Sequence, residues 1–88
     1  MRYRLEWWVY VLRCQSTGRY YVGSAQYVDV RLHDHNRGHV ASTKPYGPWS
    51  AVYREPQPNR SSAYSREREI KSKKGRRWIE YNLLLNGD

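Results

Sequence analysis

The chain has 88 residues, enough for one modest hydrophobic core, and we expect residues 1–88 to form a single domain. Its 16 Lys and Arg outnumber its 8 Asp and Glu, and the net charge of +8 favours a nucleic acid as partner over a membrane surface. The one cysteine, Cys14, excludes an internal disulfide, and no apolar stretch is long enough to cross a bilayer. We therefore expect a cytoplasmic protein.

The first expected element is a strand over residues 7–14 (WWVYVLRC), which are mainly aromatic or β-branched. Side chains alternate between the two faces of a strand, which places Trp8, Tyr10, Leu12 and Cys14 on one face and Trp7, Val9 and Val11 on the other. A turn over residues 15–18 (QSTG) leads into a second strand over residues 19–23, so the two strands should form an antiparallel hairpin. In such a hairpin Tyr10 and Tyr21 can be cross-strand neighbours.

A helix is expected over residues 27–36, with Gly38 placed to end it. Val28 and Leu32 share one helical stripe, and Arg31 and His35 lie beside that stripe, one turn apart. The Gly, Pro, Ser and Thr content of residues 38–48 indicates a loop, and residues 49–54 (WSAVYR) predict a short third strand.

Two helices complete the predicted fold. Ser61 or Ser62 can cap a helix that runs from residue 63 to about residue 74, and Gly75 breaks it. Residues 76–85 predict an amphipathic helix that buries Trp78 and Leu85 or their neighbours. The order ββαβαα therefore predicts an α+β fold, in which helices flank a small three-stranded antiparallel sheet.

One carboxylate stands out in the first of these two helices. At about 100° per residue, Ala63, Glu67 and Ile70 share the face that the helix turns toward the sheet. A charge between an alanine and an isoleucine is costly unless it is paired or binds a cation. Glu67 is therefore a candidate metal ligand, although a half-buried salt bridge to Arg31 or Lys71 is the commoner arrangement for such a residue.

Several short motifs follow one another along the chain. They are the strand tripeptides Val9-Tyr10-Val11 and Tyr21-Val22-Gly23, the pair Arg31 and His35, the segment Thr43-Lys44-Pro45-Tyr46 before Pro48-Trp49, and Glu67 four residues after Ala63. Together these motifs resemble those of the GIY-YIG nuclease family, in particular its small stand-alone bacterial members. Valine stands in place of some Gly and Ile residues of the family tripeptides. For the Asn that supports the site in many members, Asn82 is the only counterpart, at a long spacing from Glu67.

The resemblance implies hydrolysis of a phosphodiester bond in a nucleic-acid backbone. Glu67 would hold one divalent ion, Mg²⁺ or Mn²⁺, which takes its other ligands from water and phosphate. Arg31 would grip the phosphate, and Tyr10 would act as the general base. Arg31 and the metal would favour the Tyr10 phenolate, His35 could accept its proton, and Tyr21 would position the water or the phosphate.

Basic residues near that site are expected to contact the substrate: Lys44 in the loop, and Arg66, Lys71 and Lys74 within a run of seven basic and two acidic residues from position 66 to 77. Exposed Trp and Tyr among basic residues could stack on unpaired bases, which favours single-stranded or branched DNA. The sequence contains no motif for reading a long base sequence, so we expect a DNA endonuclease with little sequence specificity.

Other interpretations of the same residues stay open. A non-catalytic basic module with the same fold would bind nucleic acid without needing Glu67, so this residue separates the two hypotheses. A zinc site built from Cys14, His33, His35 and His39 would have spacings that match no usual structural site. The oligomeric state is open as well, since cutting both strands of a duplex could require a homodimer.

Overall fold

The computed structural model describes residues 6–72 and 75–86 of the protein, with side chains up to residue 82. The elements in these residues are β1 (Trp7–Cys14), β2 (Tyr20–Ala25), α1 (Val28–Asn36), β3 (Trp49–Gln57), α2 (Arg60–Ser72) and α3 (Gly75–Asn86). Their order is the predicted ββαβαα, and the predicted α+β fold is confirmed.

The three strands form an antiparallel sheet in the order β2-β1-β3, which places β1 at the centre. The register sets Tyr10 opposite Gly23 and Leu12 opposite Tyr21. On the other side of β1, a bulge after Val11 shifts the pairing with β3. Because β2 comes first in the order, one of its edges has no strand partner among the residues that the structure describes, and the tripeptide Tyr21-Val22-Gly23 lies on this edge strand.

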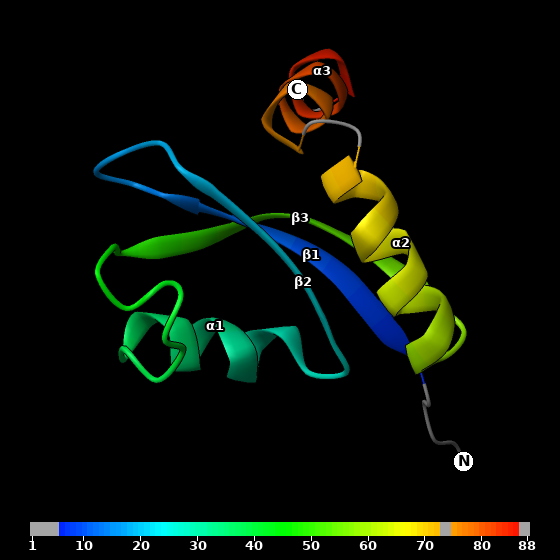
Figure 1. Cartoon of the computed structure of the whole chain (residues 1–88), viewed down its shortest axis with the longest axis horizontal. Coiled ribbons are helices and arrows are strands. Elements are labelled where there is room, and N and C mark those ends of the chain that lie inside the picture. The colour runs from blue at the N-terminus through cyan, green and yellow to red at the C-terminus, as the bar shows by residue number, and fades with distance from the viewer. Residues whose placement is uncertain (1–5, 73–74, 87–88) are drawn as a thin grey trace.

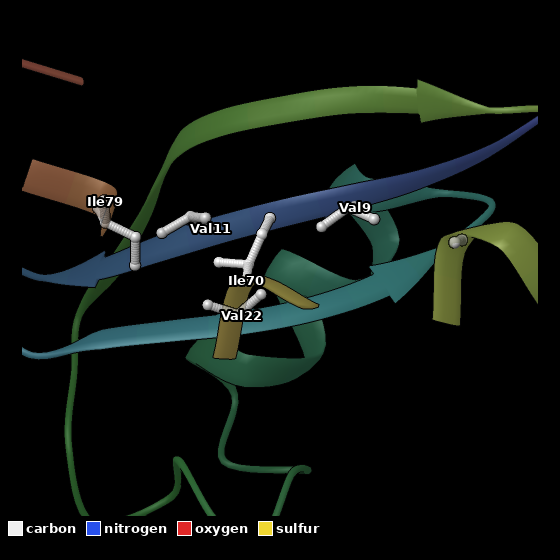
Figure 2. Close-up of a cluster of buried hydrophobic side chains, with 6 residues drawn as sticks. Val9, Val11, Val22, Ile70 and Ile79 are labelled. Carbon is white, nitrogen blue, oxygen red and sulfur yellow. The ribbon is translucent and has the colours of Figure 1, made fainter. Parts of the chain in front are cut away.

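Helices cover both faces of the sheet, with α1 on one face and α2 and α3 on the other (Figure 1). The cluster beneath α2 and α3 consists of Val9, Val11, Val22, Ala63, Ile70 and Ile79, most of which Figure 2 shows converging from strands and helices. The cluster beneath α1 consists of Tyr10, Leu12, Cys14, Ala25, Val28 and Trp49. The alternation predicted for β1 is therefore confirmed. Tyr10 belongs to the α1 face, whereas Glu67 comes from the helix on the opposite face.

The start of α2 differs from the prediction. The helix begins at Arg60 and not at residue 63. The side chain of Asn59 accepts a hydrogen bond from the backbone N–H of Ser62 at 2.8 Å, so Asn59 is the capping residue and the prediction of Ser61 or Ser62 is wrong. Asparagine caps a helix as well as serine does, and residue type alone does not choose between neighbouring candidates.

The third strand and the last helix extend beyond their predicted bounds, β3 to Gln57 and α3 back to Gly75. Among the α3 side chains that the structure describes, Ile79 is buried, and Trp78 packs beside it at the margin of the core. The predicted burial of Leu85 concerns a side chain outside the described residues. In the part of the chain that the structure describes, no helix has both the length and the apolar character that a membrane span requires.

Asn36, the last residue of α1, fixes both ends of the loop that leads to β3. Its side-chain amide donates to the Trp49 carbonyl at 3.0 Å, and its side-chain oxygen accepts from the Trp49 N–H at 2.7 Å. This reciprocal pair joins the end of α1 to the first residue of β3. The loop closed in this way brings Thr43 against His35.

Candidate active site

Gly23 has no side chain, which leaves room for the side chain of Tyr10 to lie across the edge strand β2; we call this place the crossing of Tyr10. The Tyr10 ring lies so close over this glycine that a Cβ on Gly23 would be 2.6 Å from the phenol oxygen and 2.8 Å from Cζ. Side chains with a Cβ almost never make contacts below 3.0 Å, so another residue at this position would displace the ring. Through this gap, Tyr10 of the central strand brings its hydroxyl to the edge strand β2.

Tyr21 and His35 complete an aromatic cluster around Tyr10. The ring centroids of Tyr21 and His35 are 4.6 Å apart, and the Tyr10 centroid lies 6.3 Å and 6.2 Å from them. Because Tyr21 stands opposite Leu12, the two tyrosines are diagonal neighbours and not the directly opposed pair that the hairpin suggested. The diagonal arrangement still keeps the two rings on the same face of the sheet.

His35 is only 1% exposed and holds a hydrogen bond on each ring nitrogen. Its Nε2 lies 3.2 Å from the Tyr10 hydroxyl, and its Nδ1 lies 2.8 Å from the Thr43 hydroxyl. Thr43 donates its single hydroxyl proton to the Val40 carbonyl at 3.3 Å, so it accepts from Nδ1–H of His35. The neutral imidazole therefore carries its lone pair on Nε2, where the Tyr10 hydroxyl donates.

The two partners of this hydrogen bond have opposite pKa shifts. Burial, and then the charge of Arg31, lower the pKa of His35 below its ordinary value of 6.5 against a smaller opposing effect of Asp34. Burial, and then Tyr21, raise the pKa of Tyr10 to about 12, although Arg31 acts in the other direction. Arg31 thus acts in the predicted direction, but in the protein alone desolvation outweighs this one guanidinium and favours the phenol; the predicted effect of the metal stays a prediction. The lowered pKa keeps the His35 imidazole uncharged at neutral pH, so its Nε2 can accept a proton from the Tyr10 hydroxyl.

Arg31 approaches the cluster from α1, one turn before His35. Its guanidinium lowers the pKa of both Tyr10 and His35, which places its charge near both groups. The Nη1 atom lies 3.6 Å from the Asp34 carboxylate, and the Arg31 side chain remains 40% exposed. An exposed guanidinium with one distant carboxylate partner can still bind a phosphate through two hydrogen bonds.

Glu67 approaches the same edge from α2. The fully buried Ala63 and Ile70 lie on its helix face, as predicted, and the Glu67 side chain is only 14% exposed. Ser24 donates a hydrogen bond to Oε1 at 2.9 Å, and the Lys71 ammonium lies 2.7 Å from Oε2. The carboxylate is therefore paired with Lys71, which is one of the two ion pairs that the sequence left open.

Ser24 directly follows Gly23 on β2. Its hydrogen bond to Glu67 therefore holds the carboxylate next to the residue over which the Tyr10 ring lies. The negative charge of Glu67 also contributes to the raised pKa of Tyr10. The phenol and the carboxylate come from opposite faces of the sheet. Both reach the edge strand β2, where they contact the consecutive residues Gly23 and Ser24.

The surroundings of Glu67 fit a hard divalent ion that keeps several of its waters. Within residues 6–72 and 75–86, no three His, Cys, Asp or Glu side chains gather into a metal-binding group. Glu67 is the carboxylate that lies here, with the Ser24 hydroxyl beside it, and Mg²⁺ commonly binds through one or two carboxylates plus water and substrate phosphate. Lys71 is 51% exposed and can move its ammonium into solvent, which frees the second carboxylate oxygen.

The other residues predicted to contact substrate lie in different places. Lys44 is exposed in the loop between α1 and β3. Lys71 lies at the edge of the site, joined to Glu67. Lys74 is outside the described residues.

Arg66 turns away from the β2 edge and toward β3. Its guanidinium donates to both carboxylate oxygens of Glu55, at 2.8 Å and 3.3 Å, and to Glu69 at 3.0 Å. It also lies over the Trp78 ring, 5.4 Å from the centroid. These contacts join β3, α2 and α3, so the structure does not bring Arg66 to the cluster around Tyr10.

Sequence patterns alone do not reveal the parts played by Gly23, Ser24 and Thr43. Gly23 and Thr43 stand within the motifs that carry the family resemblance, and Ser24 directly follows one of them, which is the signal that points to them. Asn82, the one counterpart that the sequence offers for the supporting Asn, donates its side-chain amide to the Trp78 carbonyl within its own helix.

Comparison with known proteins places the chain in a family. Residues 6–82 match the GIY-YIG catalytic domain, so the chain belongs to the GIY-YIG nuclease family. It is 43% identical to UPF0213 proteins of Staphylococcus aureus strains Mu3 and Mu50 over 65 residues, which cover 73% of this chain and 78% of each relative. A solution NMR structure of a UPF0213 protein from Bacillus halodurans has a TM-score of 0.56 and 31% identity, covering 93% of this chain and 86% of that one. The resemblance to small members of the family is thereby confirmed.

Proposed function

We propose that the protein is a metal-dependent endonuclease that hydrolyses phosphodiester bonds in DNA with little sequence specificity. The observation that carries the proposal is the meeting of Tyr10 and Glu67 at the β2 edge, from opposite faces of the sheet. Packing alone does not require a phenol to cross a strand above Gly23, nor a carboxylate between Ala63 and Ile70. Membership of a nuclease family and the net charge of +8 both support a nucleic-acid substrate.

A water activated through Tyr10 and His35 is the proposed nucleophile. The water gives a proton to the Tyr10 oxygen while the Tyr10 hydroxyl proton passes to Nε2 of His35, and the resulting hydroxide adds to phosphorus. The bond to the leaving oxygen then breaks, and that oxygen takes a proton from solvent. Tyr10 begins and ends this exchange as a phenol, so its raised pKa does not prevent the transfer. Thr43 keeps the accepting nitrogen of His35 turned toward Tyr10.

The remaining residues would bind and orient the phosphate. Arg31 would neutralise its non-bridging oxygens with a planar, exposed guanidinium. Glu67 and Ser24 would hold Mg²⁺ or Mn²⁺, and such an ion, when bound, supplies a positive charge that stabilises the leaving oxygen. Tyr21, which packs against His35, would orient the attacking water through its hydroxyl.

The proposal is tested with labelled single-stranded, duplex and branched DNA, each incubated with Mg²⁺, Mn²⁺ or EDTA. We expect cleavage with either ion and none with EDTA. Glu67→Gln should lower the rate at least about 10²-fold, because it removes a charge that acts at the reacting phosphate, while DNA affinity stays within a few-fold. Glu69→Gln is the matched control, since Glu69 lies two residues further on and pairs with Arg66 away from the site.

A non-catalytic basic module is the second candidate, and the ion pair between Lys71 and Glu67 favours it, because a carboxylate satisfied by lysine needs no metal. This candidate predicts DNA binding that weakens steeply with salt, without cleavage of any of the three substrates under any metal condition. Such a result would replace the endonuclease proposal.

A further inference from the structure

A groove opens along β2 on the side of the loop between α1 and β3. Its volume is about 460 Å³, within the roughly 300–1,000 Å³ of small-ligand sites. Basic and aromatic side chains line it, among them Arg19, Lys71, Arg76, Tyr20, Tyr21 and Tyr46. Tyr21 also packs against His35 and Lys71 also pairs with Glu67, so the groove is continuous with the candidate active site.

Two pairs of arginine and tyrosine form flat, positively charged surfaces in this groove. The guanidinium carbon of Arg19 lies 4.2 Å from the centroid of the Tyr46 ring, and that of Arg76 lies 5.3 Å from the Tyr20 ring. Arg76 is held further by a hydrogen bond to the Gly18 carbonyl at 3.1 Å. Tyr46 is 37% exposed, so part of its ring is accessible to a ligand.

We infer that this groove binds an unpaired nucleobase next to the phosphate to be cut, with the Arg19–Tyr46 pair as its stacking surface. The inference rests on the proposed function, because it takes the cut phosphate to lie beside Tyr21. Every base offers a π face to an aromatic ring or a guanidinium plane, and the neighbouring cations neutralise the backbone. A paired base would first have to leave its own stack, which costs energy. The groove therefore selects single-stranded DNA or the unpaired part of a branched molecule.

A second groove, of about 390 Å³, lies at the other end of β2 and supports the same path for a single strand. Its lining includes Trp7, Tyr27, Arg31 and Arg60, and the Arg60 guanidinium carbon lies 5.7 Å from the Trp7 ring. Aromatic and basic side chains thus stand at both ends of the strand, with the crossing of Tyr10 between them. A single DNA strand with a phosphate at the crossing of Tyr10 would extend into both grooves.

The test measures binding with Glu67→Gln as the background, so that cleavage does not interfere. Three labelled ligands of equal length are compared: single-stranded oligothymidylate, the same backbone with abasic sugars, and a duplex. Tyr46→Leu removes the π face and keeps an apolar side chain, whereas Tyr46→Phe keeps both. Tyr64→Leu is the matched control, because Tyr64 also pairs with an arginine, Arg68 at 5.7 Å, is 55% exposed and lies outside the groove.

We expect Tyr46→Leu to weaken single-strand binding about tenfold, within the range measured for the loss of one base–aromatic stack. Binding of the abasic strand and of the duplex should stay within about twofold, and Tyr46→Phe and Tyr64→Leu should bind as the background does. An unchanged affinity for oligothymidylate, or an equal loss for the abasic strand, overturns the inference.

The outcome is separable from that of the proposed function. If the wild-type protein cuts DNA while Tyr46→Leu binds every ligand normally, the inference of base binding in the groove is wrong and the endonuclease proposal stands. If no cleavage occurs while Tyr46→Leu loses affinity only for the strand that carries bases, base binding in the groove stands and the endonuclease proposal is wrong.

Discussion

Replacing Gly23 with alanine perturbs the crossing of Tyr10 directly. The added Cβ would lie 2.6 Å from the phenol oxygen, whereas ordinary van der Waals contact begins at 3.4 Å, so the phenol must move by about 3.4 − 2.6 = 0.8 Å. Tyr21 limits how far the Tyr10 ring can move, because the Tyr21 Cε2 atom also lies only 3.0 Å from the same Cβ. The hydrogen bond from Tyr10 to His35 is already 3.2 Å long, and a further displacement of this size away from His35 breaks it.

We expect Gly23→Ala to slow cleavage about 10²-fold, the effect of a misplacement near 1 Å in an active site. It should also lower the free energy of unfolding by about 1–3 kcal/mol, as overpacking of a core does. Single-turnover cleavage with excess enzyme gives the first quantity, and urea unfolding followed by Trp fluorescence gives the second. Gly75→Ala is the matched control, because nothing lies within 4 Å of a Cβ there.

Two results would refute the reasoning about Gly23. A Gly23→Ala protein that cuts DNA within about threefold of the wild-type rate would mean that the Tyr10 hydroxyl is not needed where it lies. A loss of rate that matches the loss of folded protein would mean that the crossing serves packing only. Equal defects in Gly75→Ala would show that the assay reports a general sensitivity to alanine.

The other predictions concern pH and the role of Arg66. Because burial lowers the pKa of His35, the cleavage rate should rise with pH at a value below 6.5 and then stay level. His35→Gln should remove this rise. A rate that keeps climbing into the alkaline range would instead make Tyr10 the base. Unfolded protein binds the His35 proton more readily, so stability should fall as the pH drops below 6.5, and less so in His35→Gln by urea unfolding. Burial would raise the pKa of Glu55, but bonds from Arg66 and Tyr53 lower it below 4.5, so its contribution to stability is present above pH 4.5 and lost below it as the carboxylate protonates. Arg66→Met should lower the free energy of unfolding by about 1–3 kcal/mol, measured by urea unfolding, and should leave the cleavage rate within a few-fold. A large loss of DNA affinity would instead assign Arg66 to substrate binding.

The fold is predictable from the sequence because its local signals agree with one another. The apolar alternation of the first strand, the turn after Cys14 and the one-sided placement of Ala63 and Ile70 each specify which side faces the core. The errors lie at element ends, where several residue types serve equally well. At the start of α2, Asn59 caps the helix in place of Ser61 or Ser62 because it stands where the chain leaves β3.

The candidate site is predictable only as far as single elements allow. Helical periodicity places Arg31 beside His35, and sets Glu67 on the buried face of its helix. The crossing of Tyr10 over Gly23 depends on the register between two strands, which residue types near the turn do not determine. The raised pKa of Tyr10 depends on burial by all the layers around it, and neither burial nor its balance against Arg31 can be read from a motif.

The rotation of α2 about its own axis also limits how well the sequence predicts which of its residues face the candidate site. Arg66 and Glu67 are adjacent in the basic run, yet Arg66 binds Glu55 on β3 while Glu67 accepts a bond from Ser24 on β2. Consecutive residues on a helix differ by about 100° in direction, so an error of one residue in the assumed rotation would place Arg66 toward β2 in place of Glu67.

The outer edge of β2, which pairs with no strand in the described part of the chain, also affects how copies of this protein meet one another. A free strand edge offers its N–H and C=O groups to any other free edge, which is a common start of aggregation. Arg19, Lys71 and Arg76 flank this edge in a chain of net charge +8, so two copies that approach edge to edge repel each other. The same three charges attract a polyanion. Removing them would weaken the DNA binding that we propose and, at the same time, allow the sheet to extend into a neighbouring molecule.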